Sequence, residues 1–287
     1  MKTISGINNK GGVGKTATVG AVVHILATIY DKKILAVDID PQGNLSKLFG
    51  FTGSDRKYSL KEEIEGKIYP VQNTIEDILM DSSKNIHDCI YQTGYKNLDI
   101  IPAYLTLSNV ENQLLGNALT PQQEKLKKQL AKIQEEYDYC FIDCGPSVSL
   151  LNINALYASD EVYIPSKSDK DSRNGIVNML NLMRTVQECN PGLKLGGCFL
   201  TQFDERKNIC KEAWADCKEA LGNKFLPIAI PVNTKVEQTS SKQKPLYELD
   251  PSGKATQSYI KLAEYMMAPN KKIYLDNLQK NNENMDK

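Results

Sequence analysis

Lys10-Gly11-Gly12-Val13-Gly14-Lys15-Thr16 is the stretch that decides the fold of this chain. Residues 2–7 form a short β-branched run that predicts a buried strand, and residues 17–30 have the apolar spacing of a helix. Glycines let successive backbone N–H groups point into one hollow, and a helix start adds partial positive charge. A strand, a glycine turn and a helix in this order predict a phosphate-binding loop.

The end of the loop specifies a nucleoside triphosphate and a metal ion. Lys15 is placed to reach the β- and γ-phosphates of ATP, and the Thr16 hydroxyl is placed to ligate the Mg²⁺ that bridges them. The backbone around these two residues would surround the phosphates. The predicted nucleotide-binding residues of the loop are Gly11, Gly12, Val13, Gly14, Lys15, Thr16 and Ala17.

The loop departs from the general phosphate-loop pattern in two places. Asn9 stands where the pattern has a glycine, and Lys10 is an additional lysine beside it. On these residues the chain resembles the deviant Walker A ATPases, the ParA and MinD superfamily, and its ParA/Soj-type partition ATPases. The resemblance implies that Lys10 acts in trans, on the phosphates of a nucleotide held by the second subunit of a dimer. Such a cation would stabilise charge on the transferring phosphoryl group. The alternative is a solvated surface lysine.

A second motif lies in residues 33–44, where an apolar run ends in Asp38 and Asp40. This pattern is typical of a parallel central strand, and ligands bind outside the carboxyl ends of such strands. Both carboxylates are therefore expected near the nucleotide. The resemblance implies that Asp40 orients the attacking water and that Asp38 supports Mg²⁺ through water. The alternative is that residues 40–43 only form the turn that ends the strand.

A third motif is the apolar run 137–143, which ends in Asp143. A carboxylate at such a strand end is the form of a Walker B segment, which holds Mg²⁺, usually through water. Asp143 is therefore the predicted metal-side partner of Thr16. Related proteins commonly have two prolines in the next turn, whereas here Gly145 precedes the single Pro146.

Strands and helices alternate along the rest of the chain. The patterns predict a helix capped by Thr74, further strands at 97–101, 160–165, 193–201 and 224–230, and helices at 122–136, 174–188 and 208–221. This alternation predicts an α/β fold, a three-layer α/β/α sandwich around a mostly parallel twisted sheet, as in P-loop NTPases. We expect one ATPase domain over residues 1–267 and a polar tail, 268–287, that frays.

Composition limits the functions open to the chain. The 287 residues hold 35 basic and 35 acidic side chains, so DNA binding would need a local basic patch. Seven cysteines without a C-x-x-C pair favour free thiols over a metal site. The early strand leaves no room for a signal peptide, and no run approaches the length of a membrane span, so a cytoplasmic protein is expected.

The resemblance to this family covers residues 1–267. It implies that the loop at Pro231, Val232 and Asn233 lies against adenine, and that residues 250–264 match the family's last helix. It also implies an ATP-dependent homodimer that binds DNA non-specifically, associates with the nucleoid and is released when a ParB-like, centromere-binding adaptor stimulates slow hydrolysis. The basic candidates for DNA are Arg173, Arg206, Lys207, Lys211, Lys235, Lys242, Lys244 and Lys254; of these, Lys235, Lys242, Lys244 and Lys254 are preferred.

Three rival functions remain to be weighed. A membrane-cycling, MinD-like ATPase would need a basic amphipathic tail, and residues 271–287 offer few apolar side chains. A small-molecule ligase or kinase of the same fold is the second alternative. A nitrogenase-type iron protein is disfavoured, because the cysteine that would follow Cys144 is missing.

Overall fold

A parallel β-sheet forms the centre of the molecule in the computed structural model, which describes residues 1–51, 73–116 and 121–285. Eight strands follow the order β3-β4-β2-β5-β1-β6-β7-β8, and all neighbours are parallel except β3 and β4. The strands are β1 Lys2–Gly6, β2 Ile34–Asp38, β3 Tyr91–Gln92, β4 Leu98–Ile101, β5 Tyr139–Asp143, β6 Glu161–Ser166, β7 Lys194–Phe203 and β8 Phe225–Pro231.

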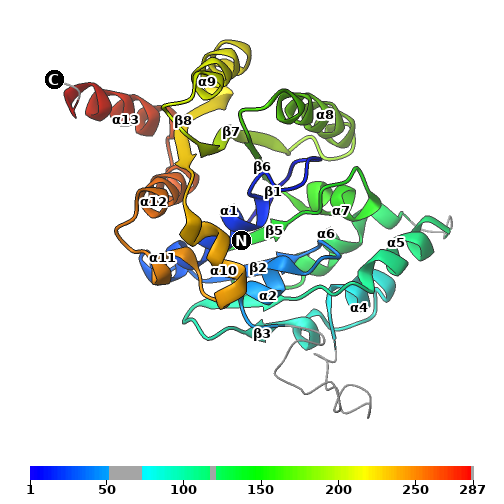
Figure 1. Ribbon diagram of the computed structural model, residues 1–287. Helices are drawn as coiled ribbons and strands as arrows, with labels where there is room; N and C mark the ends of the chain where they lie inside the picture. The colour runs from blue at the N-terminus through cyan, green and yellow to red at the C-terminus, as the bar shows by residue number, and fades with distance from the viewer. Residues whose placement is uncertain (52–72, 117–120, 286–287) are drawn as a thin grey trace.

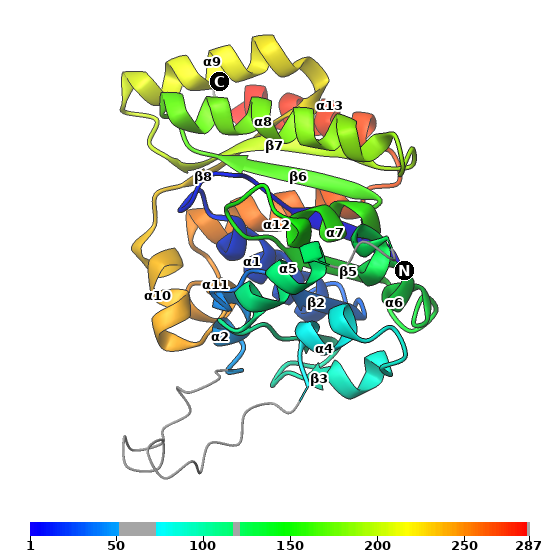
Figure 2. The ribbon, with the colours of Figure 1, turned by 90° about the vertical axis from the view of Figure 1, so that its right-hand side faces the viewer.

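Helices cover both faces of this sheet, as Figures 1 and 2 show. One core joins one face to α4 Ile75–Met80, α5 Leu107–Gly116, α6 Lys125–Ala131, α7 Leu150–Ala158, α8 Lys170–Gln187 and α9 Asn208–Leu221. A second core joins the other face to α1 Lys15–Thr28, α2 Asn44–Leu48, α11 Leu246–Leu249, α12 Lys254–Met267 and α13 Lys271–Met285. The remaining helical segments are α10 Thr234–Lys242 and the 3₁₀ turns Ile86–Cys89, Gln122–Glu124 and Gly222–Lys224.

Alternation along each strand divides the two cores. In β2, Leu35 and Val37 belong to the first core, while Ile34 and Ala36 belong to the second. All four side chains are fully buried, which explains why this strand reads as a continuous apolar run. The predicted α/β fold with three layers is therefore confirmed.

Two of the helices predicted from local signals have other bounds in the structure, and α2, α5, α7, α10 and α11 were not predicted. Thr74 caps α4 in a capping box with Asp77, as its sequence predicts. The helix predicted over 122–136 is shorter, because a 3₁₀ turn precedes α6 and turns replace the helix after Ala131. The helix predicted to begin at residue 174 begins at Lys170, because the Asp169 side chain accepts the Ser172 N–H and caps it.

The polar tail does not fray where the structure describes it. Residues 271–285 form α13, and three of its side chains, Tyr274, Leu275 and Leu278, pack against the second core. The Tyr274 hydroxyl also donates to Glu264 on α12 at 2.8 Å. The composition of this segment is polar, but a few apolar contacts and buried hydrogen bonds hold it. The division into one domain and a tail stays a prediction.

Candidate functional site

The phosphate loop lies between the carboxyl end of β1 and the first residue of α1. Gly12 and Gly14 have φ angles of 70° and 84°, in the left-handed region that glycine adopts without strain. Gly14 precedes α1, and no side chain caps the helix there. The first N–H groups of α1 therefore lack a side-chain acceptor, which is the arrangement that binds an anion at a helix start.

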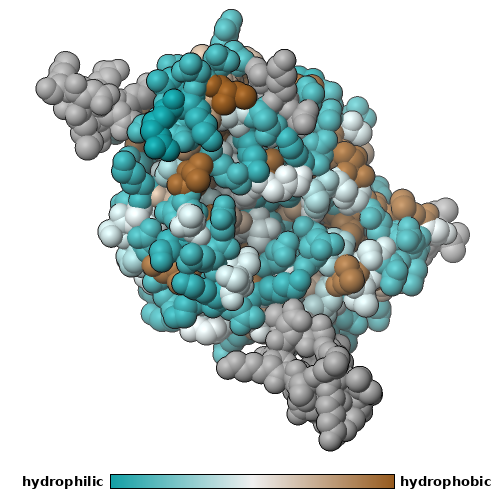
Figure 3. Space-filling model, in the orientation of Figure 1, coloured by the Kyte–Doolittle hydropathy of each residue, from teal (hydrophilic) through white to brown (hydrophobic). Residues whose placement is uncertain are grey.

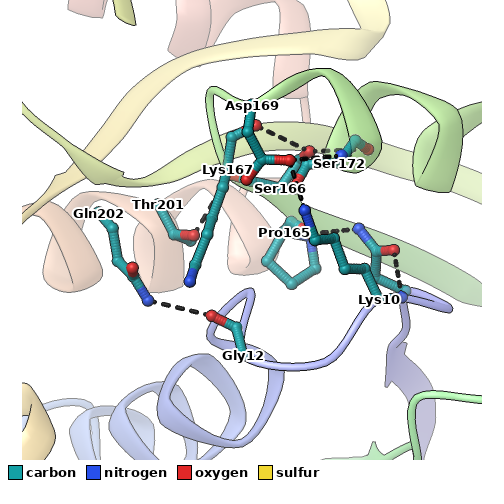
Figure 4. Close-up of polar contacts among 10 residues, drawn as sticks. Lys10, Gly12, Pro165, Ser166, Lys167, Asp169, Ser172, Thr201 and Gln202 are labelled. Atoms are coloured by element: carbon teal, nitrogen blue, oxygen red, sulfur yellow. Dashed lines mark hydrogen bonds and ion pairs between the residues drawn. The ribbon is translucent and has the colours of Figure 1, made fainter. Parts of the chain in front are cut away.

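Side chains from distant strands hold this loop in place. The Thr201 hydroxyl donates to the Val13 carbonyl at 2.8 Å, and the Gln202 side-chain amide donates to the Gly12 carbonyl at 3.0 Å. At the other end, the Asn8 amide donates to the Pro165 carbonyl at 2.8 Å (Figure 4). None of these three residues is predicted by a local motif, because nothing in a single sequence shows that the ends of β6 and β7 meet the loop.

Lys15 lies inside the loop, as predicted. Its side-chain ammonium donates to the Lys10 carbonyl at 3.0 Å, and the residue is 7% exposed. Burial lowers the pKa of Lys15, while the nearby charges of Asp143, Cys144 and Asp40 raise it. A buried ammonium that faces carboxylates is suited to binding phosphate oxygens at short range.

Asp143 occupies the end of β5, between β1 and β2. It is fully buried, and neither carboxylate oxygen accepts a well-formed hydrogen bond from the described residues. Burial raises the pKa of Asp143 well above its usual value, as does the charge of Asp38, whereas the Thr16 hydroxyl and Lys15 lower it. An unsatisfied buried carboxylate beside a hydroxyl has the oxygen ligands that Mg²⁺ requires, so the residues present fit this ion.

Asp38 lies opposite Asp143 in the β2–β5 register, and its carboxylate already has three donors. It accepts the Asp40 N–H at 3.1 Å, the Ser46 N–H at 2.8 Å and the Ser46 hydroxyl at 2.7 Å. Burial raises the pKa of Asp38 to about 7, although the Ser46 hydrogen bonds oppose this. In this structure Asp38 fixes the turn that leads into α2; its predicted role toward Mg²⁺ stays a prediction.

Asp40 begins the turn after β2. One carboxylate oxygen accepts the Gln42 N–H at 2.9 Å, and Gly43 closes the turn with a φ of 60°. The predicted turn chemistry is therefore present. The carboxylate is also only 6% exposed, and it lies close enough to Lys15 to raise the pKa of that ammonium. A Cβ added at Gly145 would lie 3.5 Å from Asp40, so the turn after β5 packs directly against this carboxylate.

Lys10 points away from its own loop. Its ammonium is ion-paired with the Asp169 carboxylate at the start of α8, as Figure 4 shows. Its backbone is held by the Asn8 side chain, which accepts the Lys10 N–H at 3.0 Å. The Lys10 side chain is 30% exposed, so it is partly accessible from outside the subunit.

A second cation, Lys167, lies over the loop and was not predicted. Figure 4 shows its side chain reaching from the end of β6 toward Gly12. A Cβ added at Gly12 would lie 3.7 Å from the Lys167 ammonium. Among the described residues this ammonium has no ion pair. Lys167 directly follows β6 in the sequence. It reaches the loop because β6 lies beside β1 in the sheet.

The adenine candidates lie at the end of β8, where Phe203 pairs with Pro231 in the β7–β8 register. Val232 is 56% exposed, and the Asn233 side chain caps α10 by accepting the Lys235 N–H at 2.7 Å. Pro231 and Val232 line a hollow of about 970 Å³. We call it the α9–α12 hollow; its other lining residues are Phe203, Asp204, Glu205, Arg206, Lys207, Lys211, Trp214, Ala229, Ser252, Lys254, Gln257, Ser258 and Lys261.

The preferred DNA candidates lie on α10, just after it and at the start of α12. Lys254 lines the α9–α12 hollow with Arg206, Lys207 and Lys211, beside the adenine candidates. Lys235 and Lys242 lie on α10, and Lys244 follows it and is ion-paired with Glu248. Arg173 is part of α8, but its side chain is outside the described residues. Arg206, Lys207 and Lys211 therefore share a hollow with Lys254, and the choice among the DNA candidates stays a prediction.

Sequence comparison finds partition proteins. A sequence profile for an AAA domain matches residues 1–195. The sporulation initiation inhibitor protein Soj of Bacillus subtilis is 35% identical over 93% of this chain and 98% of its own length. The chromosome-partitioning ATPase Soj of Treponema pallidum is 32% identical over 93% of this chain and 97% of its own length.

Structural comparison finds the same fold in proteins of different activity. Cobyrinic acid a,c-diamide synthase of Mycobacterium smegmatis, solved with an ATP analogue and magnesium, has a TM-score of 0.74 at 25% identity, covering 93% of this chain and 94% of its own. A plasmid partition protein of Borrelia burgdorferi bound to AMPPNP has a TM-score of 0.73 at 24% identity, covering 93% of this chain and 99% of its own. The fold is thus shared by a synthase and a partition protein. The function therefore has to be inferred from the residues of the site rather than from the fold.

Proposed function

Because the chain belongs to the family of ParA and Soj chromosome-partitioning ATPases, we propose that it is a Mg²⁺-dependent ATPase that partitions DNA. In this proposal ATP binding forms a sandwich dimer, the dimer binds DNA without sequence preference, and an adaptor of the ParB kind stimulates hydrolysis and releases it. The observation that carries the proposal is the convergence of Lys15, Asp40 and Asp143 at one edge of the sheet, with Lys10 directed away from it.

The residues at this edge divide the work of phosphoryl transfer. Lys15 and the N–H groups of the loop hold the phosphates, and Lys167 adds a second cation above Gly12. Thr16 and Asp143 would hold Mg²⁺, which neutralises charge on the phosphates when it is bound. Asp40 orients the attacking water, since it is nearly buried and already fixed by the Gln42 N–H.

The direction of Lys10 supports a role in trans. Within one subunit the Lys10 ammonium is ion-paired with Asp169, whereas the Lys15 ammonium stays inside the loop on the Lys10 carbonyl, so the two side chains point in different directions. Exposed ion pairs of this kind contribute about 1 kcal/mol or less. A triphosphate presented by a second subunit carries more charge than one carboxylate, and it can therefore displace Asp169. ADP lacks the γ-phosphate, which gives the dimer its dependence on ATP.

The α9–α12 hollow is the surface that best fits DNA. It presents Arg206, Lys207, Lys211, Lys254 and Lys261, against Asp204 and Glu205. Asp204 is ion-paired with Arg206 at 2.9 Å. Among the lining residues, Glu205 is then the one acid left to offset the charge of the four lysines. The face seen in Figure 3 is mostly hydrophilic, with apolar side chains in separate spots. A polar surface with clustered lysines is suited to phosphates rather than to apolar partners.

The membrane-cycling alternative gains no support from the tail. Among the residues described, no helix is long and apolar enough to cross a bilayer. In α13 the apolar side chains Tyr274, Leu275 and Leu278 pack against the second core, and Ile273 is the large apolar side chain that stays exposed, at 57%. A surface-bound helix would need those side chains for lipid.

DNA co-sedimentation with ATP, with ADP and without nucleotide, at two salt concentrations, tests the proposal. We expect binding with ATP alone, and weaker binding at high salt, because each phosphate contact adds roughly one unit to the salt slope. Lys211→Gln and Lys254→Gln should weaken binding, while Lys242→Gln on α10 should not. Equal DNA binding with ATP and with ADP would refute the proposal that ATP controls DNA binding. Hydrolysis that is stimulated by a metabolite instead of by DNA and an adaptor would favour the ligase or kinase alternative.

A further inference from the structure

A second cavity lies at the opposite end of the strands from the phosphate loop. It has a volume of about 630 Å³ and is lined by the first residues of β6, β7 and β8, the second half of α9, the turn after it, α12 and α13. We call it the α9–α13 pocket. Its lining residues are Glu161, Lys194, Leu195, Gly196, Trp214, Lys218, Gly222, Asn223, Lys224, Phe225, Pro227, Tyr265, Lys271, Lys272, Leu275 and Asp276. Volumes between 300 and 1,000 Å³ are typical of sites for small molecules.

The pocket is strongly basic in a chain that is neutral as a whole. Five lysines and two acids line it, whereas the full chain has equal numbers of basic and acidic residues. Three of these lysines, Lys194, Lys218 and Lys272, have no ion pair with any of the residues that the structure describes. They come from three different elements, and like charges that line one pocket without an ion pair repel one another. An anion in the pocket would relieve this repulsion.

The most buried acid of the pocket is already neutralised. Glu161 is ion-paired with Lys271 and, at 2.9 Å, with Lys2. Burial raises the pKa of Glu161, but the bonds from these two lysines outweigh burial and hold it below its usual value. The Lys271 ammonium also donates to the Tyr163 hydroxyl at 2.7 Å and lies 5.1 Å from the centre of the Tyr265 ring. Glu161 therefore does not cancel the charge of the three unpaired lysines.

One wall of the pocket is aromatic and rigid. The Trp214 ring on α9 packs edge-on against Phe225, with 4.9 Å between ring centres, and against Phe203 at 5.6 Å. Trp214 is partly exposed and lines the pocket, and its ring is packed against two other aromatic rings. A planar ring held in this way is a stacking surface for another flat ring.

We propose that the α9–α13 pocket binds a small anion that joins a planar ring to two or more phosphate groups, with Lys194, Lys218 and Lys272 on the phosphates and Trp214 against the ring. A nucleoside bisphosphate has this chemistry. A pocket of about 630 Å³ fits a small molecule better than a nucleic acid, which needs an extended track. The pocket is at the amino ends of β6–β8 and the phosphate loop is at the carboxyl ends, so this ligand does not compete directly with ATP.

The only tryptophan of the chain makes the proposal testable, because Trp214 fluorescence reports on the pocket. The probe is adenosine 3′,5′-bisphosphate, titrated into the wild-type protein and into Lys15→Ala, which disables the phosphate loop. We expect a saturable fluorescence change in both proteins. Inorganic pyrophosphate should bind about tenfold more weakly for lack of the ring, and adenosine should not bind measurably.

Two variants separate this pocket from the α9–α12 hollow, which Trp214 also lines. The double variant Lys218→Gln with Lys272→Gln should weaken binding of the bisphosphate by about tenfold or more. Lys211→Gln, in the other cavity, should change this affinity by no more than about twofold. Unchanged ATP affinity of each variant shows that the fold is intact. The proposal is overturned if no saturable change occurs, if Lys211→Gln has the larger effect, or if the double variant loses binding of a short DNA duplex while the bisphosphate never binds.

Discussion

The ammonium of Lys10 is ion-paired with Asp169, and the same Asp169 side chain caps α8 by accepting the Ser172 N–H at 2.8 Å. Bonds to Lys10 and Ser172 lower the pKa of this carboxyl although partial burial raises it. One carboxylate thus holds the lysine that is expected to act in trans and the start of a long helix. The two duties can be separated by mutation.

Asp169→Ser keeps a capping hydroxyl and removes the charge, whereas Asp169→Ala removes both. We expect Asp169→Ala to lower the free energy of unfolding by about 1 kcal/mol, and Asp169→Ser by clearly less, because a serine hydroxyl caps a helix nearly as well as a carboxylate. In ATP the dimer dissociation constant of Asp169→Ser should change by no more than about fivefold, since an exposed pair contributes about 1 kcal/mol or less. Urea unfolding and analytical ultracentrifugation measure the two effects. A monomeric Asp169→Ser protein in ATP would contradict the view that the pair is a resting contact.

Lys10→Ala tests the role in trans. The variant should bind ATP within about twofold of the wild type and fail to form a dimer, because the lost cation acts on the partner's nucleotide and not on its own. Lys15→Ala is the matched control and should lose ATP altogether, since its ammonium lies inside the loop. Equilibrium dialysis and ultracentrifugation of both variants separate affinity from assembly. Normal dimerisation and hydrolysis by Lys10→Ala would exclude the trans role and leave the phosphate loop unaffected.

Asp40→Ala should give a dimer that is locked with ATP and still binds DNA. The reason is that Asp40 positions water. The positions of Lys15 and Thr16, which hold the phosphates and Mg²⁺, do not depend on the hydrogen bond between Asp40 and Gln42. Hydrolysis should fall by a factor of about 100 or more, in the range expected for loss of a positioning group. Phosphate release and DNA co-sedimentation measure both properties. If the variant is monomeric or free of DNA, the assigned role is wrong.

Lys167→Gln should weaken ATP binding by about three- to tenfold, because the lost ammonium lies over Gly12 and a charge-assisted contact contributes about 1 kcal/mol. AMP, which lacks the β- and γ-phosphates, should be affected far less. Isothermal titration of the variant with ATP, ADP and AMP gives the comparison. Equal losses for all three nucleotides would place the effect elsewhere than at the phosphates.

His24 makes the fold sensitive to acid. It is buried on α1 against Tyr95, with 4.5 Å between ring centres, and burial lowers its pKa from 6.5 to about 4. The unfolded chain therefore takes up a proton at a higher pH than the folded chain, so the stabilising contribution is complete above pH 6.5 and is lost as the pH falls toward 4. At pH 5 the loss is about 2 kcal/mol.

His24→Phe removes this titration and should flatten the decline of unfolding free energy between pH 7 and pH 5. His87, whose ring is exposed and bonded to Glu136 at 2.9 Å, provides the matched control as His87→Phe. Urea denaturation at the two pH values compares the variants. An unchanged slope in His24→Phe would assign the acid sensitivity to other groups.

Some of the fold and most of the phosphate site could be read from local patterns. Consecutive glycines before Lys15 and Thr16 admit few backbone conformations, and apolar runs that end in Asp40 or Asp143 place their carboxylates at one edge of a parallel sheet. These features depend on residues close in sequence. For the same reason local patterns misjudged α13, whose contacts come from α12 and β8, and the length of the helix at 122–136.

The sequence by itself determined the alternation of the main strands and helices, the loop and the chemistry of its residues, since backbone conformation and side-chain type are local properties. The tertiary structure alone decided which distant residues meet. It put Thr201, Gln202 and Lys167 on the loop, because β6 and β7 end beside β1, and it paired Lys10 with Asp169. It also placed Lys254 with Lys211 in the α9–α12 hollow and formed the α9–α13 pocket from strands and helices that are far apart in the sequence. Contacts between residues more than a hundred positions apart depend on how strands are ordered in the sheet, and no local pattern records that order.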